Sequence, residues 1–233
     1  MIQQNKGKIY LGEERGHDEL DWFRSLHTFN FGQYNNEHKT PVGPLYILNE
    51  DTLAGKRSLT ILAEEDSEML LIPVVGAVTW QTSNGHSGEV EAGESVQLAI
   101  PLGTTINISN PYEEELVNFL QLWFHHPAID KNIAPEHLFF DINANKNKLV
   151  QLPQLHTTSV VNHFIGCFDG RSEITHQLSK PHNALFVFVI QGAFEVQYRL
   201  LHPKDGLALW DLEAAELEAL SNDAIILLSE ITV

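Results

Sequence analysis

Short runs of apolar and β-branched residues, separated by turn residues, recur along the chain, and helical periodicity is scarce. Residues 74–81 form such a run, and the Asn84-Gly85 pair that follows favours a tight hairpin because both residues tolerate positive φ. Residues 211–220 fit no period clearly, since Ala, Glu and Leu favour helix but form no apolar stripe. The density of short strands predicts an all-β chain, folded as an antiparallel barrel or sandwich.

The strand pattern occurs twice along the chain. A strand-Gly-strand hairpin is centred on Gly76 in the first half and on Gly192 in the second. The chain between the halves is rich in turn residues, and a short helical turn is expected near Pro135. The strand candidates of the second half are residues 160–168, 173–178, 184–190, 194–199, 206–212 and 224–228. We therefore predict an N-terminal barrel over residues 1–125, a linker over residues 126–155 and a C-terminal barrel over residues 156–233.

Charge and cysteine content limit the partners and the compartment. The sequence carries 31 acidic and 14 basic residues, a formal net charge of -17. Such a surface repels phosphate backbones and anionic lipids, which argues against nucleic-acid binding and membrane docking. Cys167 is the single cysteine, so no intramolecular disulfide can form. The segment from Met1 to Lys6 lacks an apolar run of signal-peptide type. These features predict a cytoplasmic protein.

A series of short motifs follows in order along the chain. They are Arg15-Gly16-His17, His27-Thr28-Phe29-Asn30-Phe31, Val42-Gly43-Pro44-Leu45, Glu91-Ala92-Gly93-Glu94, Asn110-Pro111, Asn118-Phe119-Leu120-Gln121-Leu122-Trp123 and Asp205-Gly206-Leu207-Ala208-Leu209-Trp210-Asp211. Together they resemble the pirin family, whose members are bicupins, and the last motif resembles the second cupin of bacterial pirin-like proteins. The resemblance covers essentially the whole chain and implies two cupin barrels in tandem.

The resemblance also implies a metal site, and this chain departs from it. The N-terminal cupin of the family holds a non-haem iron through three His and one Glu. Some members oxidise quercetin with dioxygen, and others act as iron-dependent partners of transcription factors. In this sequence the four ligand positions fall on Leu62, Glu64, Ile106 and Ile108. Because such iron needs imidazole and carboxylate ligands, and only Glu64 can supply one, the usual site is predicted to be lost.

Two further expectations concern the barrels themselves. With Leu62, Ile106 and Ile108 lining it, the first cavity is predicted to be apolar, and such a cavity either packs shut or binds an apolar molecule. A relocated metal site would have its best ligands in His176 and His182, which flank a short segment of the second barrel. No third ligand stands at matching spacing, and solvated or hydrogen-bonded His is the usual state of such residues.

Three classes of function agree with these observations. The leading hypothesis is a metal-free pirin-like protein, without a cofactor, that binds an apolar small molecule or a protein partner in a regulatory role. The alternative is an enzyme, a dioxygenase of the quercetin-oxidising type that uses iron or another divalent metal at His176 and His182. A structural subunit would show neither ligand nor activity. The sequence leaves open the oligomeric state and the choice between enzyme and binding protein.

Overall fold

The computed structural model describes residues 5–130, 133–152, 154–155, 159–180 and 182–232. These residues form strands, turns and one 3-10 turn at Gly12–Glu14, and the described ranges contain no α-helix. Every pairing between the strands is antiparallel. The expected all-β fold is confirmed. Consistent with this, a helix long and apolar enough to cross a membrane is missing from the described ranges.

The chain divides into two compact units. The unit that we call the N-terminal unit contains residues 16–140 and the described part of residues 153–159. The C-terminal unit contains residues 160–232 together with residues 141–152 and, from the other end of the chain, residues 5–15. The expected division at residues 125 and 155 differs from these units, because the start of the chain joins the last strands and the predicted linker is shared between both units.

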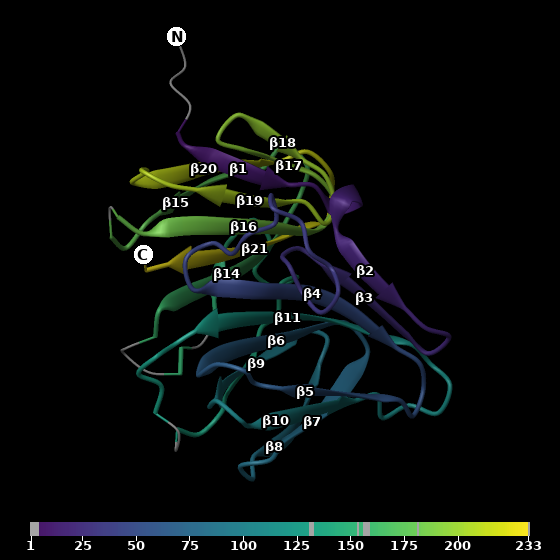
Figure 1. Ribbon diagram of the computed structural model, residues 1–233. Coiled ribbons are helices and arrows are strands. Elements are labelled where there is room, and N and C mark those ends of the chain that lie inside the picture. The colour runs from purple at the N-terminus through teal and green to yellow at the C-terminus, as the bar shows by residue number, and fades with distance from the viewer. Residues whose placement is uncertain (1–4, 131–132, 153, 156–158, 181, 233) are drawn as a thin grey trace. The chain divides into compact units, whose positions relative to one another are not determined.

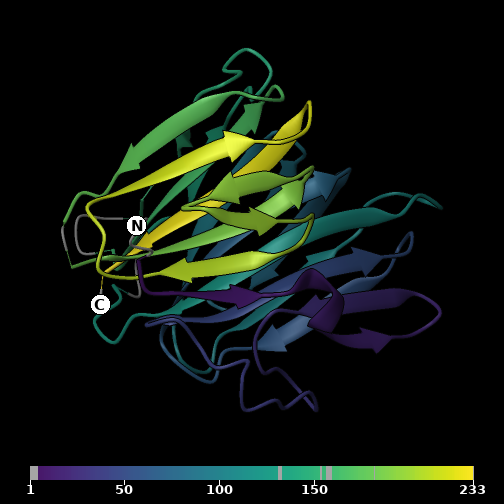
Figure 2. The same cartoon turned by 90° about the horizontal axis from the view of Figure 1, so that it is seen from above.

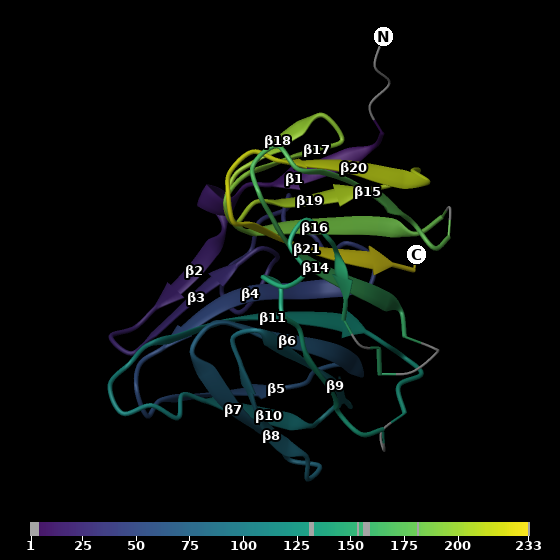
Figure 3. The same cartoon turned by 180° about the vertical axis from the view of Figure 1, so that it is seen from behind.

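The N-terminal unit consists of two sheets around one core (Figures 1 and 3). The seven-stranded sheet has the order β12-β9-β6-β11-β4-β3-β2, and the four-stranded sheet has the order β5-β10-β7-β8. The strands are β2 (Gly16–Glu19), β3 (Phe23–His27), β4 (Leu45–Leu53), β5 (Ser58–Leu62), β6 (Ser67–Val75), β7 (Ala77–Thr82), β8 (Ser87–Glu91), β9 (Glu94–Ile100), β10 (Thr105–Ser109), β11 (Val117–His125) and β12 (Glu136–Phe139). The expected Asn84-Gly85 turn joins β7 to β8, and Gly85 has a φ of 100°.

Alternate side chains of both sheets meet in this core, as the period of two of a strand requires. The four-stranded sheet contributes Val78, Ile106 and Ile108, and the seven-stranded sheet contributes Phe119 and Trp123. All five are almost completely buried. Two sheets that share one apolar interior form the closed barrel expected of a cupin.

The C-terminal unit repeats the plan with a six-stranded sheet of order β1-β19-β16-β21-β14-β13 and a four-stranded sheet of order β15-β20-β17-β18 (Figure 1). The strands are β1 (Gly7–Tyr10), β13 (Val150–Gln151), β14 (Val161–Phe168), β15 (Glu173–Gln177), β16 (Ala184–Gln191), β17 (Phe194–Val196), β18 (Arg199–Leu201), β19 (Gly206–Leu209), β20 (Ala214–Ala219) and β21 (Ala224–Ile231). A second apolar core, which includes Phe168, Val187, Phe194 and Leu228, lies between these sheets.

The first described strand, β1, forms the edge of the six-stranded sheet (Figure 2). It pairs with β19, with Gly7 opposite Leu209 and Tyr10 opposite Gly206. The Tyr10 ring is buried and meets Phe186 edge-on at 5.9 Å between ring centroids. The backbone amide of Gly12 donates to the Asp205 carboxylate over 2.6 Å, so the segment after β1 is also held by the C-terminal unit.

Two local expectations are corrected. The helical turn expected near Pro135 is absent, because residues 136–139 form β12 and pair with β9 along its edge. Residues 214–219, which fitted no period in the sequence, form β20 between β15 and β17. In β20 the buried face is made by Ala215, Leu217 and Ala219. Alanine fits a crowded sheet interior although its intrinsic preference is helical, so packing overrides propensity.

Candidate functional site

A cavity of about 330 Å³ lies in the N-terminal unit beside β4, β5 and β11. Its wall is predominantly aromatic and aliphatic, and it carries one carboxylate. The lining residues are Asn30, Phe31, Gly32, Tyr46, Ile47, Ile61, Leu62, Ala63, Glu64 and Trp123. Concave, largely apolar pockets with a few polar groups are the usual form of small-molecule sites.

Strand pairing explains why these side chains gather there. Ile47 on β4 lies opposite Trp123 on β11, so both side chains leave the sheet on the same face. The pairing of β4 with β11 shifts just after Trp123, which marks a β-bulge next to the cavity. β5 ends at Leu62, and the chain then turns through Ala63, whose amide donates to the carbonyl of Thr104 over 2.9 Å. Leu62 and Glu64 are consequently solvent-exposed at the edge of the cavity.

The structure separates the four positions at which the pirin resemblance places metal ligands. Leu62 and Glu64 border the cavity, and the side chain of Leu62 is 56% exposed. Ile106 and Ile108 are fully buried in the barrel core and do not line the cavity. In the β5–β10 pairing, Ile106 faces Ile61 whereas Leu62 faces Thr105, so Leu62 and Ile106 point to opposite faces of this sheet. The expectation that Leu62, Ile106 and Ile108 line one cavity is therefore corrected.

Iron of the family type does not fit these residues. Leu62, Ile106 and Ile108 have no donor atoms, which leaves Glu64 as one carboxylate among four positions. Over the described ranges, no group of three or more His, Cys, Asp or Glu side chains is arranged to hold a metal ion. The chemistry of this donor set gives no basis for a reaction step through a metal in the N-terminal unit.

A buried chain of hydrogen bonds fixes the tryptophan that lines the cavity. The indole Nε1 of Trp123 donates to Oε1 of Gln121 over 2.7 Å, and Nε2 of Gln121 donates to the Asp51 carboxylate. Trp123, Gln121 and Asp51 are each at most 1% exposed. Because the indole nitrogen is bonded to Gln121, the ring is held in one orientation beside the cavity.

The hydroxyl of the second aromatic residue of the wall, Tyr46, is also engaged. It lies 2.7 Å from Oγ of Ser67, and Oγ of Ser67 donates to the carbonyl of Glu65 over 3.1 Å. The Ser67 proton is thus used, and the Tyr46 hydroxyl is the donor to Ser67. Burial, with smaller contributions from Glu65 and Glu64, raises the pKa of Tyr46 to about 12, although the bond to Ser67 lowers it. Tyr46 therefore stays neutral at physiological pH.

The two residues of the predicted ligand pair in the second barrel differ in exposure. His182 is solvent-exposed, whereas His176 is 7% exposed and contacts Phe164 with 4.6 Å between ring centroids. The neighbour of His176 is instead Glu230, whose Oε2 lies 3.7 Å from Nε2 of the histidine, longer than a hydrogen bond. Strand alternation explains why His176 and Glu230 meet. His176 lies two positions after the inward-facing Ile174, and Glu230 lies two positions after the inward-facing Leu228, so both side chains point inward.

Glu230 is the centre of a polar cluster that the sequence analysis missed. Its Oε1 accepts hydrogen bonds from the backbone amide of Ser179 over 2.8 Å, from the Ser179 hydroxyl over 2.5 Å and from the Asn183 side chain over 2.5 Å. Burial alone raises the pKa of Glu230, but His176, Ser179 and Asn183 more than offset it and lower the pKa to about 2. A carboxylate on an inward position of a strand was the available signal in the sequence.

Ser25, His27 and Asp18 form a linear arrangement that resembles a hydrolytic triad. Oγ of Ser25 lies 3.3 Å from Nδ1 of His27, and Nε2 of His27 lies 3.2 Å from the Asp18 carboxylate. Ser25 is 1% exposed and His27 is fully buried, so a substrate cannot approach the hydroxyl. This network braces β2 against β3 and does not form a nucleophilic site.

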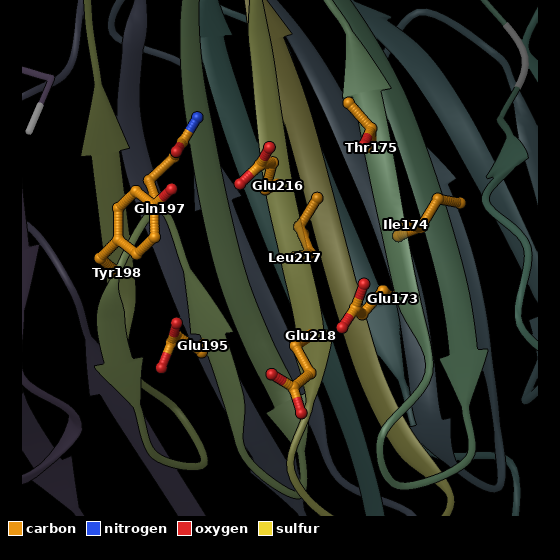
Figure 4. Close-up of a pocket in the computed structure, with 9 residues that line it drawn as sticks. All are labelled: Glu173, Ile174, Thr175, Glu195, Gln197, Tyr198, Glu216, Leu217 and Glu218. Atoms are coloured by element: carbon orange, nitrogen blue, oxygen red, sulfur yellow. The ribbon is translucent and has the colours of Figure 1, made fainter. Parts of the chain in front are cut away.

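An acidic groove of about 460 Å³ crosses the four-stranded sheet of the C-terminal unit (Figure 4). Glu218 on β20 lies directly opposite Glu173 on β15 and opposite Glu195 on β17, which places three carboxylates in one row. Arg171 pairs with Glu218 over 3.1 Å. Like charges in opposite positions of a sheet destabilise it, and exposure to water reduces this effect. The groove is a strongly acidic, solvated surface.

Comparison with known proteins shows what the chain is similar to. The model of the quercetinase C-terminal cupin domain of pirins matches residues 154–231. Quercetin 2,3-dioxygenase of Escherichia coli K12 is 26% identical over 228 residues, which cover 94% of this chain and 97% of the relative. These matches support the resemblance to pirin-family bicupins. The relative aligns over both units in chain order, and the all-β fold agrees with it.

Solved structures agree with this chain in fold. The crystal structure of YhhW from Escherichia coli has a TM-score of 0.82 and 23% identity, and the match covers 98% of this chain and 99% of YhhW. The crystal structure of the bacterial pirin YhhW in complex with nickel(II), also from Escherichia coli, has a TM-score of 0.80 and 22% identity over 97% of this chain and 99% of that chain. At this identity the structures establish a common fold.

Proposed function

We propose that this pirin-like protein binds a small, largely apolar molecule in the cavity of its N-terminal unit, without using a metal ion there. One observation carries the proposal. Leu62 and Glu64, which occupy two of the family's ligand positions, border an aromatic-lined cavity, while Ile106 and Ile108, at the other two, fill the core beneath. Replacing metal ligands with apolar side chains removes the metal but keeps a pocket into which a ligand can bury apolar surface.

The alternative is a dioxygenase of the quercetin-oxidising type. It is supported by the similarity to quercetin 2,3-dioxygenase of Escherichia coli K12 and to YhhW, which was crystallised in complex with nickel(II). It requires at least three convergent ligands on a divalent metal with an open position. His176 and Glu230 are the nearest approach to such a set in the C-terminal unit, and Ser179 and Asn183 already hold the Glu230 carboxylate. We therefore place binding ahead of dioxygenase chemistry.

The first prediction is that tag-free protein, purified without chelators, contains far less than one transition-metal ion per chain. The physical reason is that the four ligand positions supply one carboxylate, which cannot hold a divalent metal against water. Elemental mass spectrometry at known protein concentration measures this. Near-stoichiometric iron or nickel would contradict the proposal, and loss of that metal in His176→Ala would locate it at the relocated site.

The second prediction concerns the cavity. Leu62→Trp places a large ring at its exposed edge and should weaken binding of a neutral apolar probe, N-phenyl-1-naphthylamine, at least about tenfold, or about 1.4 kcal/mol. Probe fluorescence during titration gives the affinity. The matched control is Leu102→Trp, because Leu102 is also exposed, at 62%, and does not line this cavity. Equal binding to both variants would show that the probe does not enter the cavity.

A further inference from the structure

The cavity wall combines aromatic rings with negative charge. Phe31, Tyr46 and Trp123 contribute three aromatic side chains, and Glu64 contributes a carboxylate. No Lys, Arg or His is among the described residues that line it. Aromatic faces attract cations through their quadrupole, and a carboxylate attracts them through its charge. This wall is therefore suited to a positively charged ligand and unsuited to an anion.

Glu64 is available to a ligand. Within the described ranges of the chain it makes no hydrogen bond and no ion pair, in contrast to the acidic residue that follows it. The distance between Oε2 of Glu65 and Nδ1 of His125 is 2.7 Å, so His125 is the partner of the Glu65 carboxylate. The carboxylate of Glu64 is solvent-exposed at the cavity edge, where no cationic side chain competes for it.

The polar hydrogens of two aromatic residues are already used. Trp123 donates its indole proton to Gln121, and Tyr46 donates its hydroxyl proton to Ser67. Tyr46 therefore offers a ligand its ring surface and an oxygen that can accept but not donate, whereas Trp123 is 1% exposed and supports the wall from within. Burial is the main cause that raises the pKa of Tyr46, and the nearby carboxylates Glu65 and Glu64 raise it further, so the potential at the Tyr46 hydroxyl is negative. Each of these features favours a ligand that carries positive charge rather than a phenolate or a carboxylate.

We propose that the ligand of this cavity is an organic cation of the alkylammonium class, whose apolar substituents contact Phe31 and Tyr46 and whose charge is balanced by Glu64. The inference rests on the proposed binding function and names the class of ligand for the same cavity. A quaternary ammonium group fits best because it carries charge without donor hydrogens, and the wall presents apolar surface around one carboxylate.

The test compares two probes of nearly equal shape. Choline is titrated by calorimetry against its neutral carbon isostere, in which a tert-butyl group replaces the trimethylammonium. We expect wild-type protein to bind choline roughly five- to tenfold more tightly than the isostere. Glu64→Gln should remove most of this difference while leaving affinity for the isostere unchanged. The control Glu91→Gln removes one exposed negative charge of the same unit, on β8 outside the cavity, and should leave the preference intact.

The outcomes separate the two proposals. A cation preference that Glu64→Gln removes and Glu91→Gln keeps supports the inference. Equal affinity for both probes, with both weakened by Leu62→Trp, would overturn the cation class and leave the binding cavity in place. Cation binding that Leu62→Trp does not affect would overturn it as well, by placing the cation outside the cavity. Failure of choline to bind, while N-phenyl-1-naphthylamine does bind, would also overturn it.

Discussion

Lowering the pH from 7 to 5 should reduce the free energy of unfolding of the wild-type protein by about 2 kcal/mol more than that of His163→Asn. His163 is fully buried on β14, with Nδ1 2.9 Å from Oγ of Ser229. Burial lowers its pKa from 6.5 to about 3. Between these values the unfolded chain binds a proton that the folded chain does not, so stability falls as pH decreases from 6.5 to 3. Over the full window the loss is about 5 kcal/mol.

Urea unfolding at both pH values measures the effect. Asparagine suits the substitution because its amide reaches the position of Nδ1 and can keep the bond to Ser229, yet it does not titrate. His182→Asn is the matched control, since His182 is solvent-exposed in the same unit and should leave the pH dependence unchanged. If wild type and His163→Asn lose the same free energy between pH 7 and 5, burial does not lower the pKa of His163 in the folded protein.

Replacing Glu230 with glutamine should lower the free energy of unfolding at pH 7 by about 3 kcal/mol. The side chain is 1% exposed, and its pKa falls from 4.5 to about 2 in the folded protein. Because the pKa of Glu230 is lower in the folded than in the unfolded protein, its charge stabilises the fold. This contribution to the free energy of unfolding is fully present above pH 4.5 and disappears as pH falls through 2. At pH 3.5 the difference in free energy of unfolding between wild type and Glu230→Gln should be smaller, about 2 kcal/mol.

The comparison is made by urea unfolding in the His163→Asn background, which removes the other large acid effect. Glu216→Gln is the control, because Glu216 is exposed on β20 and the substitution changes the net charge equally. An effect of Glu230→Gln that stays the same from pH 7 to pH 3.5 would mean that shape or hydrogen bonding, and not the charge of Glu230, stabilises the cluster with His176.

Local signals in the sequence identify most strands, and long-range pairing accounts for the errors. Asn84-Gly85 specifies its hairpin through backbone conformations that those two residues tolerate. In contrast, residues 136–139 become β12 because the edge of β9 is free to pair with them, which no property of the segment itself reveals. The alanines of β20 are strand residues for the same reason, because β15 pairs with one side of β20 and β17 with the other.

The candidate site was predictable only in part. The family resemblance directs attention to Leu62 and Glu64, and both border the cavity. It cannot reveal that Ile106 faces Ile61 inside the core, because that depends on the register of β5 and β10. The aromatic wall was also missed. Tyr46 and Trp123 are far apart in sequence, and the β4–β11 pairing brings their neighbourhoods together.

The position of β1 has a consequence for how the protein is made. β1 leaves the ribosome long before its partner β19, since the neighbouring Gly12–Asp205 bond links residues 193 positions apart. Domains generally fold as units during synthesis, N-terminal first. Here the N-terminal unit can fold while β1 is still unpaired, and the six-stranded sheet gains β1 as its edge strand only after β19 has been synthesised.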